Sequence, residues 1–448
     1  MKYEKAEKAG HIITRVIVPL ALVVAVVSLA FWGTQQRALA DEYKNTATNM
    51  YKRAFNELCT DMNDLQTALG KLRVVTSPTQ NVLLLDDIWR ISGSCVSMLS
   101  QIPSSHLDVG ELNLFITRVG DYAHALTKKA LAGETASDED RDQLDQLYAR
   151  CGEIAKDLND RLSVGDVPVA AITSDEFLTA VDDTYASTED ESKFPTLIYD
   201  GPFSESTQKQ EARGVTGDEV DMDKARELAL KLADIPSFDS EGDSNGKIPA
   251  YDFHGTYEDG REVDISITKT GGLLIWLMSS ATGTASGIPD DATVEELKKA
   301  ALDWLSAQGY ESMKATYAQY YAGTALINFA YVENDAIVYN DLIKVWVDRE
   351  TRGIVGADAR NYLFSHVERD IPAPTLSKEE AEAKVSVNLD IESSELALIP
   401  VTPTKERLCY EFKGKCDGDE YIVYIDAETG EEQQIFVIIN TENGQLTL

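Results

Sequence analysis

Tyr421-Ile-Val-Tyr-Ile-Asp426 is a strand pattern that runs into a turn at Thr429-Gly430, and two similar copies occur earlier in the chain. The copies are Ile343-Lys-Val-Trp-Val-Asp348 before Thr351-Arg-Gly353, and Val263-Asp-Ile-Ser-Ile267 before Thr270-Gly271. A supersecondary unit that recurs along a chain indicates a tandem array of small modules.

Two further signals precede each copy, and they recur with it. A helix start comes first, at Asp221, Thr293 and Ser377, and an aromatic strand follows, at Tyr251-Asp-Phe253, Asn328-Phe-Ala-Tyr331 and Tyr410-Glu-Phe412. The pattern predicts three α+β modules over residues 220–290, 291–370 and 371–448, each a helix packed on a small antiparallel sheet. Since the repeats carry no obvious catalytic group, the array indicates binding or regulation, and the chain is not expected to be an enzyme.

The composition limits the class of protein. A chain of 448 residues is long enough for about three or four domains of roughly 100–200 residues, and its 43% hydrophobic content is enough to bury real cores. A formal charge of −35 argues against nucleic acid as a partner and favours basic partners or divalent cations. The alternative is that the acidity simply keeps a secreted protein soluble.

The five cysteines are an odd number, so they cannot all pair within one chain. Cys409 and Cys416 would stand roughly 23 Å apart on one continuous strand, at ~3.3 Å per residue. They could form a disulfide only if Lys413-Gly414 made a turn. Mostly free thiols are expected, with this local bridge as the alternative.

A nearly unbroken apolar run extends from Val16 to Trp32. It is long enough to cross a hydrocarbon core of roughly 30 Å, and four basic residues precede it, at Lys2, Lys5, Lys8 and Arg15. The charge asymmetry predicts a transmembrane anchor within residues 1–36, with the N-terminus inside and the rest of the chain extracytoplasmic. The competing interpretation is a signal peptide cleaved near Ala38-Leu-Ala40, but the apolar run is longer than a typical signal core.

Residues 37–165 show apolar side chains at spacings of three and four, which predicts an all-α helical bundle with helices over 41–75, 80–101, 107–132 and 139–162. A connector over 166–219 follows, and it contains the apolar string Phe194-Pro-Thr-Leu-Ile-Tyr-Asp-Gly-Pro-Phe-Ser204. This string is interpreted either as a clip that packs on the first module or as a partner-binding segment. Its candidate contact residues are Phe194, Leu197, Tyr199, Asp200, Gly201, Pro202 and Phe203.

Motifs for catalysis or cofactor binding are not found in the sequence. The five histidines are scattered, and there is no His-Glu-x-x-His, Gly-x-Ser-x-Gly, P-loop or Cys-x-x-Cys motif. One loop weakly resembles a calcium site, with candidate ligands Glu241, Asp243, Asn245 and Asp252. Because a strand follows and Pro249 interrupts the loop, a polar hairpin loop is the favoured interpretation.

The order of anchor, helical region, Leu197-Ile-Tyr-Asp-Gly-Pro-Phe203 string and three repeats is similar to that of the YpeB family of spore germination proteins. The repeats themselves resemble PepSY modules. The resemblance implies a non-catalytic protein of the spore inner membrane or cortex. Such a protein would stabilise, localise and inhibit a cortex-lytic peptidoglycan hydrolase of the SleB type until germination. The alternatives are a pro-region-like regulator of a secreted protease and, more distantly, an envelope peptidoglycan hydrolase.

Overall fold

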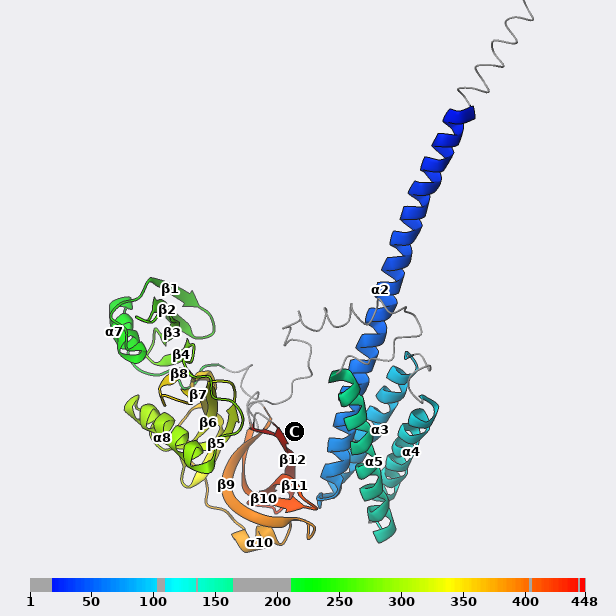
Figure 1. The fold of residues 1–448 in the computed structure, drawn as a ribbon. Coiled ribbons are helices and arrows are strands. Elements are labelled where there is room, and N and C mark those ends of the chain that lie inside the picture. Colours follow the sequence, from blue (N-terminus) through cyan, green and yellow to red (C-terminus); the bar gives the residue numbers. More distant parts are fainter. Residues whose placement is uncertain are drawn as a thin grey trace, which may run out of the picture. The chain divides into compact units, whose positions relative to one another are not determined.

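The computed structural model describes residues 18–102, 109–133, 136–163, 211–402, 405–441 and 444–447. The chain divides into two compact units (Figure 1). The first comprises residues 1–66, 88–124 and 149–190, and the second comprises 67–87, 125–148 and 191–448.

Four helices make up the described part of the N-terminal region: α2 (Val18–Leu72), α3 (Pro78–Leu99), α4 (Val109–Leu131) and α5 (Asp138–Ser163). The core of the first unit contains fully buried side chains from each helix, among them Phe55, Ile88, Ile116 and Cys151. Within each helix, the buried residues recur every three or four positions, as in an amphipathic helix. They therefore lie on one face of the helix. The predicted helical N-terminal region is therefore confirmed.

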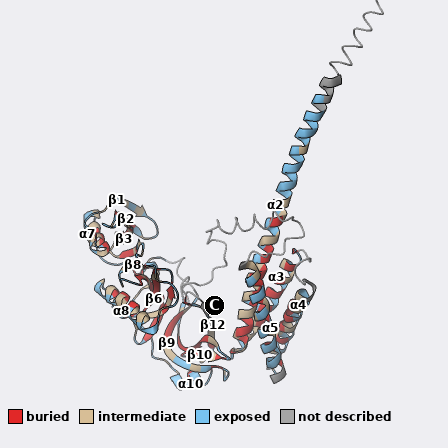
Figure 2. Ribbon diagram, in the orientation of Figure 1, coloured by how far each residue is buried: buried red, intermediate tan, exposed pale blue. Residues whose placement is uncertain are grey.

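The first turns of α2 carry large apolar side chains with little protein around them. Val23, Val27, Phe31 and Trp32 are all more than half exposed, and Figure 2 shows this stretch of α2 as exposed. Within the part of the chain that the structure describes, no helix has both the length and the apolar character that a membrane crossing needs. The described residues begin inside the apolar run at Val18, and the basic flank from Lys2 to Arg15 lies outside them.

The second unit contains one sheet of thirteen strands, in the order β1-β2-β3-β4-β8-β7-β6-β5-β13-β12-β11-β10-β9. The first module supplies β1 (Ser240–Asn245), β2 (Pro249–Thr256), β3 (Glu262–Thr268) and β4 (Leu274–Ser279). The second supplies β5 (Met313–Tyr320), β6 (Thr324–Glu333), β7 (Ala336–Asp348) and β8 (Ile354–Asp358). The third supplies β9 (Asp390–Thr402), β10 (Lys405–Cys416), β11 (Asp419–Asp426), β12 (Glu432–Thr441) and β13 (Gly444–Thr447).

A helix precedes the strands of each module and is held at its start by a side-chain cap. Asp221 accepts from the backbone N–H of Lys224 before α7 (Met222–Ala233), and Asp290 accepts from that of Thr293 before α8 (Asp291–Ala307). Ser377 forms a complete capping box with Glu380 before the short α10 (Lys378–Glu382). Such caps satisfy backbone donors that the helix leaves unpaired, so they define where each helix begins.

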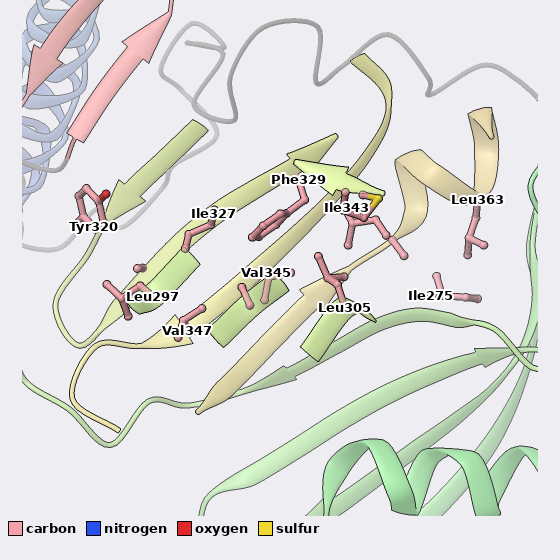
Figure 3. Close-up of a cluster of buried hydrophobic side chains, with 14 of the residues drawn as sticks. Ile275, Leu297, Leu305, Tyr320, Ile327, Phe329, Ile343, Val345, Val347 and Leu363 are labelled. Atoms are coloured by element: carbon pink, nitrogen blue, oxygen red, sulfur yellow. The ribbon is translucent and has the colours of Figure 1, made fainter. Parts of the chain in front are cut away.

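The helices α7 and α8 cover the same side of the sheet. Ala225 and Ala229 of α7 pack on Phe253 and Ile265 of the first module. Leu297, Ala301 and Leu305 of α8 pack on alternate residues of β6 and β7, and Figure 3 shows this second cluster. Alternation along the strands leaves the intervening residues on the opposite side.

The modules share strand pairings, which corrects the expectation of a small antiparallel sheet in each. β4 pairs with β8 at Trp276↔Asp358, so the first two modules form one sheet. β9 pairs with β7 in parallel, from Ala336↔Leu396 to Val338↔Leu398, and β13 pairs with β5 at Gly444↔Gln319. These pairings are between residues far apart in sequence, and the local strand pattern does not encode them.

Buried charges also connect the second and third modules. The Arg369 guanidinium donates to Asp341 at 2.7 and 2.9 Å and to Glu406 at 2.8 and 2.9 Å. Asp341 is fully buried on β7, and Glu406 lies on β10. Arg369 therefore joins a strand of the second module to a strand of the third.

The loop after α2 packs on the third module within the second unit. Val74 is fully buried in the core of that module, together with Phe412 and Tyr421. Next to it, the Arg73 guanidinium contacts Asp145, Asp417 and Asp419. This loop contributes apolar surface that the five-residue α10 is too short to supply.

The repeated strand-to-turn pattern ends in each module with a side chain that accepts from the turn, an Asp in the second and third modules and a Thr in the first. Asp348 Oδ1 accepts from the backbone N–H of Glu350 and of Thr351, each at 2.9 Å. Asp426 accepts in the same way from Glu428 and Thr429, at 2.7 and 2.9 Å. In the first module Thr268 takes this place, and its hydroxyl accepts from Leu273 N–H at 2.8 Å.

All five cysteines are buried free thiols. β10 runs without a turn from Lys405 to Cys416, so the local bridge between Cys409 and Cys416 is not formed.

Candidate functional site

The candidate partner-binding string does not enter the site described here. Phe194, Leu197, Tyr199, Asp200, Gly201, Pro202 and Phe203 all lie outside the described residues, and their proposed role stays a prediction.

The calcium candidates lie on the β1–β2 hairpin, where their oxygens contact protein groups. Lys269 Nζ donates to Asp243 at 2.7 Å and to Asn245 at 3.0 Å. Glu241 pairs with Arg226, and Asp252 accepts from the Ser266 hydroxyl at 2.6 Å. Among the described residues, no group of three or more His, Cys, Asp or Glu side chains is placed to hold a metal ion.

The strand register identifies a different surface, on the side of the sheet opposite α7 and α8. Trp276 pairs with Asp358 and Met278 with Gly356 across β4 and β8, and Asp358 and Gly356 pair with Lys344 and Trp346 across β8 and β7. Directly paired residues point to the same side of a sheet, so these side chains form two adjacent rows. We call this surface the open face; it comprises Asp252, His254, Asp264, Trp276, Met278, Lys344, Trp346, Gly356 and Asp358.

Gly356 is the point where the apolar part of the open face comes together. A Cβ at this position would meet Met278 Sδ at 2.9 Å and Trp346 Cε3 at 3.1 Å. The missing side chain therefore lets Met278 and Trp346 lie over the backbone of β8. Met278 remains 40% exposed, and both Trp276 and Trp346 are partly exposed.

The charges of the open face are balanced locally. His254 Nδ1 lies 2.8 Å from Asp264 Oδ1, and this hydrogen bond raises the pKa of His254. Asp358 pairs with Arg360, which also lines a groove of about 400 Å³ beside Trp276 and Phe364. Partly exposed tryptophan and methionine are typical of protein–protein interfaces, in which aromatic residues and Met are enriched.

The linker between the first two modules is hydrogen-bonded to the second module. Asp348 Oδ2 accepts from Thr282 N–H at 2.8 Å and from Gly283 N–H at 3.1 Å. Arg349 donates to the carbonyl oxygens of Ala285 and Gly287 at 3.1 and 2.7 Å. These bonds attach residues 282–287 to the second module, and the pairing of β4 with β8 joins the rows of side chains from both modules.

Sequence reasoning did not single out the open face. The available signal is a tryptophan within a strand pattern, which occurs at Trp276 and at Trp346. A β-bulge between Ser266 and Ile267 determines which side Trp276 takes, and nothing in the local pattern reveals it.

Comparison with known proteins connects the chain to proteins of sporulation. A family model described as YpeB N-terminal matches residues 39–164, and one described as YpeB sporulation, PepSY1 and PepSY2 domains matches 186–372. A model described as peptidase propeptide and YPEB domain matches 375–435.

Relatives named sporulation protein YpeB match over nearly their whole length. The protein of Halalkalibacterium halodurans is 25% identical, with 94% of this chain and 97% of the relative covered. The protein of Bacillus subtilis is also 25% identical, with 96% and 98% covered. Among solved structures, the Bacillus megaterium YpeB C-terminal domain matches with 26% identity and a TM-score of 0.45, over 50% of this chain and all of that domain.

Proposed function

Because the chain belongs to the YpeB family of sporulation proteins, we propose that it is a non-catalytic, membrane-anchored partner of a cortex-lytic peptidoglycan hydrolase of the SleB type. In this proposal it stabilises, localises and inhibits the hydrolase until germination. The observation that carries the proposal is the open face, a surface on paired strands that presents two tryptophans and a methionine from two joined modules.

The physical properties of the open face support binding to a folded protein. Trp276, Met278 and Trp346 supply contact area on strands, whose positions cost little conformational entropy to hold. A protein bound across this face would cover both rows of side chains, and a hydrolase bound by its glycan groove would be occluded from its substrate. Inhibition then needs no catalytic group on this chain.

The N-terminal segment supports the proposed anchoring. The apolar run from Val16 to Trp32 follows a basic flank. Six large apolar side chains in its described part are exposed rather than packed in a core: Val23, Val26, Val27, Leu29, Phe31 and Trp32. We propose that these residues contact lipid, with the N-terminus inside and the modules extracytoplasmic, at the spore inner membrane.

The test is a binding and inhibition assay with the full chain and a purified SleB-type hydrolase. Trp276→Ala and Trp346→Ala should each weaken binding by about thirtyfold, since truncation of an interface tryptophan typically costs about 2 kcal/mol or more. Trp89→Ala is the matched control, because Trp89 is an exposed tryptophan on α3, in the first compact unit and not on the open face.

The outcomes separate two parts of the proposal. If the wild-type chain neither binds the hydrolase nor slows cortex digestion, the partner is wrong. If it binds but both sheet variants retain full affinity, the open face is not the contact surface. Loss of binding in the Trp89 variant as well would indicate a general effect on the fold.

A second candidate function is regulation of a secreted protease. It is favoured by the description of the model that matches residues 375–435, which couples peptidase propeptides with YpeB. Inhibition of a secreted metalloprotease by the full chain, without an effect on the cortex hydrolase, would support this alternative. Digestion of cortex by the chain alone would instead support the more distant alternative, an envelope peptidoglycan hydrolase.

A further inference from the structure

The strands of the second and third modules close into a ring. β5, β6 and β7 pair in succession, β7 pairs with β9, the third-module strands follow from β9 to β13, and β13 pairs back with β5. A closed ring of eight strands has an interior just wide enough to be filled by side chains or to hold one small ligand.

Most of the interior is filled. Ile337, Leu342, Ile399, Ile422 and Phe436 form a buried apolar cluster inside the ring. Within it the Glu411 carboxylate accepts from the hydroxyls of Tyr339 and Tyr424 at 2.5 and 2.8 Å. Burial and the Glu411 charge raise the pKa of Tyr339, so its phenol stays protonated.

One end of the ring is not filled. A cavity of about 160 Å³ lies there, and seven of the eight ring strands contribute to its wall. The wall includes Thr316, Tyr339, Ser393, Lys413, Glu420 and Gln445. This space is many times the roughly 10–15 Å³ that one water needs, so it has room for one small molecule.

The charges at the mouth of the cavity are already paired with one another. Lys413 Nζ lies 3.2 Å from Glu411 Oε1, and Lys415 Nζ lies 2.8 Å from Glu392 and 3.8 Å from Glu420. A strongly charged ligand would have to displace one member of such a pair and leave that member without its counter-charge. The mouth therefore favours a neutral ligand.

The remaining wall groups are of two kinds. Hydroxyl and amide groups, from Thr316, Ser393 and Gln445, can donate and accept hydrogen bonds, while the Tyr339 ring and Ile422 supply apolar surface. A neutral molecule with several hydroxyls on its rim and an apolar C–H face matches both kinds. We propose that the mouth of the ring binds a single neutral saccharide unit.

The test measures binding of glucose and N-acetylglucosamine to the full chain, by calorimetry and by saturation-transfer NMR. Inorganic phosphate is the charged comparison ligand. Ser393→Phe places an aromatic ring in the cavity and should weaken saccharide binding at least tenfold. Val387→Phe is the matched control, because Val387 is 98% exposed and does not line the cavity.

A milder variant keeps the test decisive if Ser393→Phe does not fold. Gln445→Ala truncates an exposed side chain at the mouth and should weaken binding several-fold with an unchanged melting temperature. Saturable binding of a saccharide that both cavity variants weaken and the control retains is the expected result. The proposal is overturned if neither sugar binds saturably, if the cavity variants bind as well as wild type, or if phosphate binds more tightly than both sugars.

Discussion

Replacement of Asp348 by Asn tests how strongly the linker between the first two modules is held. The Asp348 carboxylate is 1% exposed and accepts five hydrogen bonds: two from the turn at residues 350 and 351, and three from Thr282 and Gly283. Burial alone would raise the pKa of Asp348, but the hydrogen bonds from the backbone N–H groups of Thr351, Thr282, Glu350 and Gly283 outweigh it and hold the pKa well below its usual range.

The magnitude follows from the donors. An Asn side chain keeps one oxygen and presents an NH₂ group where the other oxygen was, so at least two backbone N–H groups lose their acceptor. Each bond to a charged group contributes about 1.5–3 kcal/mol. We expect a loss of about 3 kcal/mol, the lower end of the sum, because water can reach part of the turn once it opens.

Amide hydrogen exchange followed by mass spectrometry measures this loss at the two places concerned. In Asp348→Asn, exchange over either residues 282–283 or residues 350–351 should rise about a hundredfold, since 1.4 kcal/mol corresponds to a factor of ten. Asp426→Asn is the matched control. It removes the equivalent turn acceptor in the third module and should leave exchange over 282–283 unchanged.

Two results would refute the reasoning. One is unchanged exchange at both places in Asp348→Asn; the other is an equal effect on residues 282–283 from Asp426→Asn. The pH dependence gives an independent check. Because the folded pKa of Asp348 is depressed, its contribution to the free energy of unfolding is fully present above the unfolded value of about 4 and is lost as the pH falls below it. The stability difference between wild type and Asp348→Asn should therefore narrow below about pH 4.

Three further predictions concern buried groups elsewhere. Arg369→Met should lower the free energy of unfolding, measured by guanidinium denaturation, by about 3–5 kcal/mol, because it leaves Asp341 buried without its main counter-charge. Adding Asp341→Asn to this variant should recover part of the lost stability. Arg73→Met should lower the free energy of unfolding by only about 1–2 kcal/mol and raise amide hydrogen exchange locally over residues 73–77, because the Asp145 and Asp417 side chains are half exposed or more and become hydrated. Arg53→Met is the control, since Arg53 is exposed and its replacement should have no effect. An equal effect of Arg53→Met would contradict this account. The five thiols should react with a thiol reagent at pH 8 only as the protein unfolds, since burial raises the pKa of Cys59 and Cys151 to about 12; rapid labelling of a thiol in the native protein would contradict this.

Local features of the fold could be predicted from the sequence because they depend on neighbouring residues. The helix starts near Asp221 and Ser377 are read from capping residues, and the turns after Asp348 and Asp426 are read from strand patterns that end in Thr and Gly. The interior positions of the N-terminal helices follow from their spacing alone.

The pairings between modules could not be predicted in this way. The parallel contact of β7 with β9 joins residues about sixty positions apart, and Arg369 reaches Asp341 from the following linker. Nothing in the sequence near Asp341 or Arg369 indicates that these charges meet, and the folded structure buries both. The open face could not be predicted for the same reason. Its two tryptophans come to one surface only through the pairing of β4 with β8, which joins residues far apart in sequence.

The ring has a consequence for how the protein is made. β13 follows every other ring strand along the chain, so a polypeptide synthesised from its N-terminus cannot close the ring until residues 444–447 have emerged. Until then the edge of β5 stays unpaired, and unpaired edges attract other strands. A nascent chain stalled before this point would therefore be distinguishable from a finished one by its open strand edge.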